Sequence, residues 1–327
     1  GPMRRRTLVG CGLTTTAAAG LGLGSGVVGS ADLARLQRNE VRLYRLTAQH
    51  GGDMLWQAAT SAADEGYAML ERGSYGASVG RQLLIVTGRL QICAGWLAFD
   101  AGHHAVAQAS NEGALALARQ ANDAELESQA LADLAWVSYV LDRPREAQRL
   151  ASAAGDVAIS ARVSARLAAI PQLRRAVASS LMADARGSAQ AIRQVRITLD
   201  GERDEAVEEW CAFVTPFEVD GVEATCALEL GHAARAQRLL EKVVIGYGHR
   251  FTRNRALYRV RLARARLDQR ELDGAAEAAN AVLDDLSGDV ASWRVSSELS
   301  VVARRLADHP HVEGVGQFLH RYSATSA

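Results

Sequence analysis

Hydrophobic residues at helical spacing dominate the chain from residue 31 onward. Over 31–50 Leu33, Leu36, Leu43 and Leu46 lie three or seven positions apart, with arginines between them, which predicts an amphipathic helix. Gly51 and Gly52 end that helix, and residues 53–72 predict a second one. We therefore expect an N-terminal helical hairpin over 31–80.

From residue 80 onward one unit recurs: a helix, a short turn with Gly, Asp or Pro, and a second helix with a small residue near its start. The turns are expected at 101–107, 142–147, 185–191, 230–236 and 269–275. The alanines that end these stretches are 40, 44, 45 and 39 residues apart, namely Ala107, Ala147, Ala191, Ala236 and Ala275. Periods of this size are typical of solenoids of helical hairpins. We predict five hairpins, with a closing helix over 290–307 as the C-terminal cap.

The small residues fit the tetratricopeptide (TPR) repeat, in which small residues occupy positions 8, 20 and 27. In the first unit these positions fall on Gly95, Ala107 and Ala114. The predicted fold is all-α, a right-handed TPR-like solenoid over 81–327. It follows the hairpin over 31–80 and a leader over 1–30.

Composition supports helices and gives no direct indication of a partner. The 327 residues include only five prolines, and 37 basic residues balance 37 acidic ones. Zero net charge does not favour binding to nucleic acid. Four scattered cysteines without a CxxC pair are typical of core thiols in a reducing compartment.

The leader contains an uncharged stretch after three arginines, RRRTLVGCGLTTTAAAGLGLGSGVVG. Its GSGVVG lacks the preceding strand that a dinucleotide site needs, its cysteine comes too early for a lipoprotein signal, and its many glycines disfavour stable membrane insertion. The two residues before Met3 look like the scar of a cleaved tag. Two interpretations stay open: a loosely packed cytosolic segment, which we favour, and a twin-arginine export signal.

Several phrases resemble one family, the actinobacterial regulators that join a helix-turn-helix to a C-terminal TPR-like region. GWLAFDAG (95–102) and RNRALYRVRLA (253–263) are the most specific, and the resemblance extends over roughly 31–322. Nothing before residue 80 reads as a helix-turn-helix, so DNA binding is not carried over. The leader resembles the junction between the two regions of that family, which implies a cytoplasmic protein.

In TPR arrays the first helix of each hairpin lines a concave groove, with positions 2, 5, 9, 12 and 13 pointing inward. These positions bring aromatic and acidic residues to one face, as a ligand groove requires, although aromatic stripes at helical spacing also form ordinary cores. With the aromatic residues that open the fourth hairpin, the candidate groove residues are Arg89, Trp96, Phe99, Asp100, Gln129, Trp136, Tyr139, Asp184, Trp210, Phe217, Glu218, Arg264 and Asp268.

Seven arginines lie close together: Arg250, Arg253, Arg255, Arg259, Arg261, Arg264 and Arg266. A helix spreads them around its axis, and the acidic stretch 201–209 is near, so a solvated or internally paired face is favoured over a phosphate-binding stripe. The histidines and cysteines show no metal-ligand spacing, and we expect neither metal nor cofactor.

These observations favour a regulatory or sensor-type protein that binds a peptide, a partner protein or a small metabolite in its groove. The resemblance implies a signalling role, such as control of specialised metabolism. An enzyme of a biosynthetic pathway, acting on a small molecule or peptide in the aromatic, acid-lined groove, is the alternative. An exported binding protein is a further one. Neither nucleic acid nor stable membrane insertion is expected, and a homodimer is an option.

Overall fold

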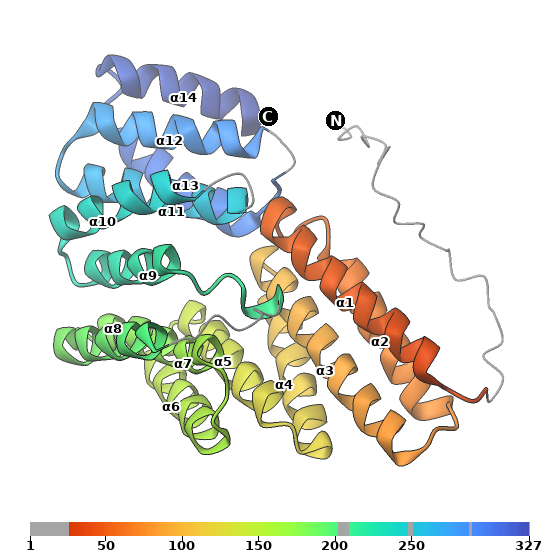
Figure 1. Cartoon of the computed structure of the whole chain (residues 1–327). Helices are drawn as coiled ribbons and strands as arrows, with labels where there is room; N and C mark the ends of the chain where they lie inside the picture. Colours follow the sequence, from red (N-terminus) through yellow and green to blue (C-terminus); the bar gives the residue numbers. More distant parts are fainter. Residues whose placement is uncertain (1–25, 202–208, 248–250, 288–289, 327) are drawn as a thin grey trace.

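The computed structural model describes residues 26–201, 209–247, 251–287 and 290–326, and this part of the chain is helical without strands (Figure 1). Most of the leader, part of the acidic stretch and Arg250 lie outside these residues. The helices are α1 (Ser30–His50), α2 (Trp56–Arg72), α3 (Ala77–Asp100), α4 (His104–Ala121), α5 (Ala124–Val140), α6 (Pro144–Ala161), α7 (Ala165–Leu181), α8 (Ala185–Asp200), the 3-10 turn η1 (Glu209–Cys211), α9 (Pro216–Glu229), α10 (Ala233–Gly246), α11 (Thr252–Asp268), α12 (Leu272–Leu286), α13 (Trp293–Leu306) and α14 (Glu313–Ser326).

The helices from α3 to α12 form five consecutive hairpins, and each hairpin packs on the next. Four of the predicted turns reverse the chain through a residue with positive φ: Gly102, Asp142, Gly231 and Arg270. The alanine five residues after each of these positive-φ residues is almost fully buried between helices, at 0–1% exposure. The TPR-like solenoid predicted from the spacing of small residues is therefore confirmed.

The third hairpin corrects the predicted register. Its turn lies at 182–184, where Ala183 has φ 59°, so residues 185–191 already belong to α8. The buried small residue five positions after Ala183 is Ser188, three residues before the predicted Ala191. Both residues are small and both are buried, so spacing alone could not distinguish them.

The two ends of the array differ from simple caps. α2 packs on α3, and α1 also packs mainly on α3 rather than on α2, its predicted hairpin partner, and reaches α11. At the other end, the predicted closing helix is α13, and α14 follows it and packs on α12 and α13. The array thus ends in a further helix pair.

A seam joins the N-terminal loop 50–53 to the loop 290–293, so the superhelix closes on itself. The amide of Ala291 donates to the carbonyl of His50 (2.8 Å), and the amide of Trp293 donates to Asp53 Oδ1 (3.0 Å). Asp100, at the end of α3, accepts a hydrogen bond from the amide of Gly52 (2.9 Å). The seam brings α1 and α3 beside α11 and α13, which lie far away in the sequence (Figure 1).

α3 passes the length and hydropathy test for a membrane-spanning helix, the only described helix that does so. However, 72% of its most apolar window is buried inside the protein, as in the core helix of a soluble domain. Its Cys93, like Cys211 and Cys226, is a buried free thiol.

Candidate functional site

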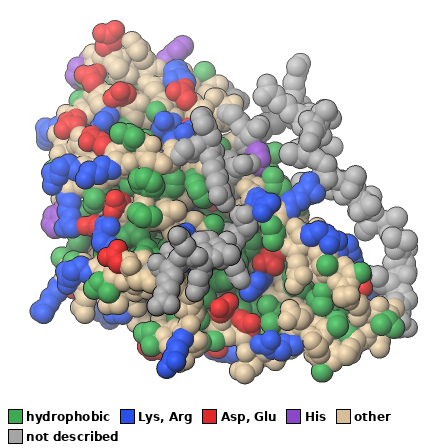
Figure 2. All heavy atoms as spheres, in the orientation of Figure 1, with side chains coloured by type: hydrophobic (Ala, Val, Ile, Leu, Met, Phe, Trp, Pro, Cys, Tyr) green, Lys and Arg blue, Asp and Glu red, His purple; other side chains and the backbone are tan. Residues whose placement is uncertain are grey.

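A cavity of about 410 Å³ lies at the centre of the closed array. Its walls come from α1, α3, α5, α7, α9, α11 and α13, together with the segment around η1. These are the first helices of the hairpins, as the TPR pattern predicts for a concave face. On the face shown in Figure 2, hydrophobic side chains gather at the level of α9 and α11, with acidic and basic side chains around them.

Aromatic rings form much of the cavity wall. Trp96 comes from α3, Trp136 from α5, and Trp210 and Phe213 from the segment around η1. The Arg174 guanidinium lies 4.3 Å from the centre of the Trp136 ring, and that of Arg253 lies 5.3 Å from Trp96. These cation–π contacts hold charged groups against apolar surface where little water is available.

Two charged residues face each other near the α5–α7 side of the cavity. Asp133 Oδ1 lies 3.5 Å from Arg174 Nη2, and Asp133 also accepts a hydrogen bond from the Gln129 amide (3.0 Å). Burial raises the pKa of Asp133 above its ordinary value, although Arg174 opposes this shift. The pair is almost fully enclosed by protein.

Three buried arginines gather on the opposite side, where α11 and α13 meet the seam. Arg253 is paired with Asp100, and Arg261 Nη2 lies 3.1 Å from Glu298 Oε1. Arg294 approaches the same Glu298 carboxylate only at 3.7 Å. Burial and then the neighbouring Arg261 and Arg253 lower the pKa of Arg294 to about 10. The guanidinium thus stays protonated at neutral pH, in a crowded and poorly solvated position.

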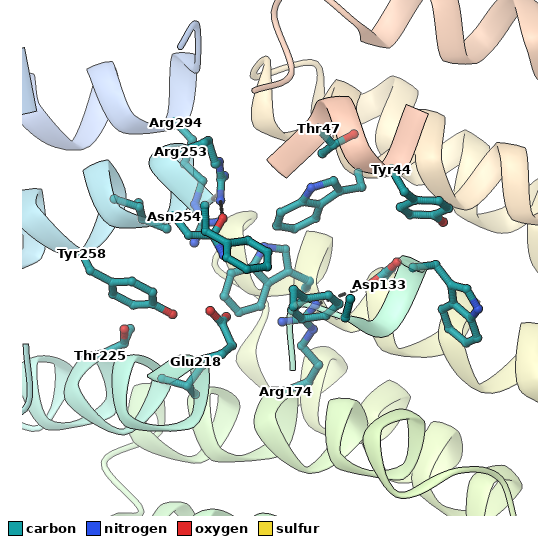
Figure 3. A pocket seen from close by; sticks show the side chains of 18 of the residues that line it. Tyr44, Thr47, Asp133, Arg174, Glu218, Thr225, Arg253, Asn254, Tyr258 and Arg294 are labelled. Atoms are coloured by element: carbon teal, nitrogen blue, oxygen red, sulfur yellow. Dashed lines mark hydrogen bonds and ion pairs between the residues drawn. The ribbon is translucent and has the colours of Figure 1, made fainter. Parts of the chain in front are cut away.

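Glu218 brings a carboxylate to the cavity from α9, and it points inward in Figure 3. Its Oε2 accepts a hydrogen bond from the hydroxyl of Tyr247 (2.7 Å). Tyr258 also interacts with it, and burial followed by Glu218 raises the pKa of the Tyr258 hydroxyl. Both tyrosines are neutral donors, so they hold Glu218 in place without cancelling its charge.

A second cavity of about 260 Å³ lies beside the first, between α5, α9, α11 and α13. Arg264 lines it and pairs with Glu229 (2.9 Å), and Tyr139 forms part of its wall. Arg305 also lines it and pairs with Asp268 (2.7 Å). Each of these arginines has a carboxylate of its own.

The structure brings five of the thirteen predicted groove residues into the main cavity: Trp96, Gln129, Trp136, Trp210 and Glu218. Tyr139 and Arg264 line the second cavity, and Asp268 lies next to it. The remaining five line neither cavity: Arg89, Phe99, Asp100, Asp184 and Phe217.

Those five have other roles. The Arg89 guanidinium lies 5.6 Å from the centre of the Trp210 ring and within 4.0 Å of the Glu40 and Glu125 carboxylates. Phe99 is a core residue beneath Trp96, and Asp100 belongs to the seam.

Asp184 and Phe217 lie at helix ends. Asp184 is exposed and caps α8 by accepting a hydrogen bond from the amide of Gly187 (2.8 Å). Its assignment to the groove was wrong because the third hairpin was placed three residues too late. Phe217 is 40% exposed and packs on Tyr247 at the start of α9.

Sequence reasoning missed one lining position in the second to fifth hairpins, the residue directly after the second predicted groove position. In the second hairpin this residue is Asp133, and with the corrected register it is Arg174 in the third; Val222 and Arg261 occupy it in the next two. The residues just before them, Ala132, Leu173, Gly221 and Val260, do not line the main cavity, so the inward face is turned by one residue from the predicted one. The described arginines of the 250–266 run are internally paired as predicted. Arg255 and Arg259 pair with Asp285 of the same hairpin, whereas the others also reach acids outside it.

The cavity lining is suited to non-covalent binding. Two threonines line the described cavity, and the hydroxyl of each donates a hydrogen bond to the backbone. Thr47 donates to the Leu43 carbonyl (2.8 Å), and Thr225 donates to the Gly221 carbonyl (2.8 Å). Within residues 26–201, 209–247, 251–287 and 290–326, no group of three His, Cys, Asp or Glu residues could hold a metal ion. Aromatic faces, guanidinium groups and a fixed carboxylate remain as the available chemistry.

Comparison with known proteins supports the fold. No protein-family model and no curated protein matches the chain. Among solved structures, it is similar to a Rap protein crystallised in complex with competence and sporulation factor, with a TM-score of 0.54 and 13% sequence identity. The match covers 90% of this chain and 98% of that one. At this identity the likeness shows a shared TPR-like helical-repeat fold, whereas the resemblance to actinobacterial regulators stays a prediction.

Proposed function

We propose that this protein is a regulatory TPR-like sensor that binds a short peptide in its central cavity. The observation that carries the proposal is the cavity itself, which is enclosed by both ends of the array and lined by indole rings and buried charges. Its volume lies within the range of about 300–1,000 Å³ common for ligand pockets. That size suits a small molecule or a few residues of a peptide.

The solved structure with a similar fold supports the peptide interpretation. That Rap protein was crystallised with competence and sporulation factor. We extend binding of a signalling factor from that protein to this chain. Because the cavity touches helices on both sides of the seam, a bound ligand would link the two sides and alter the surface offered to a partner protein.

Affinity selection from a random pentapeptide mixture, followed by calorimetric titration of the enriched peptides, tests this function. The wild-type protein should enrich a distinct subset, and Trp96→Ala should weaken its binding at least about tenfold, because truncation of a central indole usually removes a large share of binding energy. Tyr322→Ala, outside the cavity on α14, serves as the control and should bind as the wild type does.

Circular dichroism and the melting temperature establish that each variant is folded. Trp96→Leu, which keeps an apolar side chain in the wall, provides a second variant if Trp96→Ala is unstable. Enrichment of no peptide by the folded wild type, or equal binding by the wild type and both Trp96 variants, would refute the proposal.

A further inference from the structure

Four buried arginines line the main cavity, but not every one of them has a carboxylate of its own. These arginines are Arg174, Arg253, Arg261 and Arg294, and the carboxylates that face them or share the cavity are Asp133, Asp100, Glu298 and Glu218. Three of the arginines are paired with three of the carboxylates. Arg294 and Glu218 are left over, on different helices.

Arg294 has no carboxylate of its own. Among the described residues, its nearest carboxylate is Glu298 at 3.7 Å, which is already bound by Arg261 through two contacts of 3.1 and 3.2 Å. The guanidinium is stacked between aromatic rings, 4.9 Å from Trp136 and 5.5 Å from Phe99. A buried cation with a shared counter-ion is costly, and a second anion would stabilise it.

Glu218 is a carboxylate without a cationic partner in the described part of the chain. In the described part of the chain its hydrogen-bond partners are tyrosine hydroxyls, and no arginine or lysine lies within ion-pairing distance of it. Figure 3 shows Arg253 and Arg294 reaching into the cavity from one side and Glu218 from α9 below them. The two unmatched charges therefore lie on separate walls of the same cavity.

We propose that the cavity selects a zwitterionic ligand, whose carboxylate binds at Arg294 and whose cationic group binds at Glu218. The apolar body of the ligand lies against Trp96 and Trp136, between the two charges. A short peptide with free termini has this chemistry, and so does a peptide with charged side chains or an aromatic amino acid. This inference rests on the proposed function and names the ligand class of the same site.

Donor groups around Arg294 support an anion at that end. Trp136 Nε1, in a ring that lies against the Arg294 guanidinium, and Arg253 Nε are buried donors without a hydrogen-bond partner in the described structure. Neither of these nitrogens can accept a hydrogen bond, so only an acceptor would satisfy them. A carboxylate offers several acceptor positions at once and pairs readily with guanidinium groups.

The test uses one random pentapeptide mixture of uncharged residues in four forms: free termini, acetylated amino end, amidated carboxyl end, and both ends blocked. The wild type should bind the free form most tightly. Blocking either end should weaken binding by roughly ten- to a hundredfold, the loss expected for a charge-assisted contact.

Two variants separate the two ends. Arg294→Gln should abolish the preference for a free carboxyl end and keep the preference for a free amino end, whereas Glu218→Gln should do the reverse. Arg264→Gln is the matched control and should change neither preference, because Arg264 lines the second cavity and is paired with Glu229. Arg294→Lys should retain part of the carboxylate preference.

Two further sets of probes identify the source of the charges. If side chains rather than termini supply the two charges, end-blocked peptides that contain Asp and Lys should bind, whereas uncharged peptides with free termini should not. A small zwitterion is tested by measuring the binding of free tryptophan, N-acetyltryptophan and tryptophanamide to the wild type and to the same variants. Any of these sources, with the expected dependence on Arg294 and Glu218, supports the proposal.

The results also separate this inference from the proposed function. If uncharged, end-blocked peptides bind as tightly as free ones and Trp96→Ala still weakens them, the peptide-binding function stands and the zwitterion inference is wrong. If tryptophan binds with the expected charge dependence but no peptide binds, the charge inference stands and the peptide function fails. Binding of neither class overturns both.

Discussion

The ion pair between Asp100 and Arg253 should be one of the main stabilising contacts of the closed array. The two residues are 153 positions apart, and their side chains are 1% and 4% exposed. Asp100→Asn keeps the size of the side chain and an acceptor for the Gly52 amide, but leaves a buried arginine without its counter-ion. Removing one partner of such a pair costs about 3–5 kcal/mol.

This cost can be expressed as a change in melting temperature. At about 2 cal/mol/K of unfolding entropy per residue, a chain of 327 residues has an unfolding entropy near 0.7 kcal/mol/K. The melting temperature of Asp100→Asn should therefore fall by about 4–7 °C in differential scanning calorimetry.

Two further variants make the measurement specific. Asp284→Asn removes an exposed partner of Arg321, at 65% exposure, and should lower the melting temperature by about 1 °C or less because surface pairs contribute little. Asp100→Asn combined with Arg253→Met should be more stable than Asp100→Asn alone, since no uncompensated charge remains. The reasoning is refuted if Asp100→Asn and Asp284→Asn melt together, or if the double variant shows the sum of the single losses.

Three other outcomes are expected. Gly52→Ala should destabilise the protein measurably in calorimetry, because its new Cβ would overlap the backbone of α3, whereas Gly76→Ala meets nothing within 4 Å and should be tolerated; equal melting temperatures would contradict this. Burial raises the pKa of the Cys93 thiol, so iodoacetamide should modify it only in the unfolded protein, as peptide mapping can establish, and rapid labelling of the folded protein would count against this. Burial opposes the charge of Glu298, but Arg261 and Arg294 outweigh it and lower its pKa, so its stabilising effect is present above pH 4.5 and is lost as pH falls through the folded value. Glu298→Gln should therefore flatten the decline of unfolding free energy in acid measured by urea titration, and an unchanged slope would exclude this account.

Local patterns in the sequence were sufficient to predict the fold. Leucine spacing and the paired glycines placed α1 and α2 within a few residues, and recurring alanines after left-handed turns placed four of the five hairpins. The third hairpin failed because Gly187, which suggested the turn, lies inside α8, and because Ser188 and Ala191 are both small and buried.

The site was only partly predictable for a different reason. Trp96, Trp136 and Glu218 occupy repeated positions of the inner helices, which a periodic pattern can identify. Arg253 and Arg294 reach the cavity because the array curls until its two ends meet. The spacing of residues within one repeat cannot predict such a contact, because the contact depends on the total curvature of all the hairpins.

The seam also fixes the number of hairpins between its two edges. An open solenoid can gain or lose a repeat, because each repeat touches only its neighbours and the new end resembles the old one. Here the loop over 50–53 must meet residues 291 and 293, and this match depends on the summed rotation of every hairpin between them. Removing or duplicating a single hairpin would displace one edge of the seam from the other. The closed array therefore has the architecture of a repeat protein and the fixed size of a globular one.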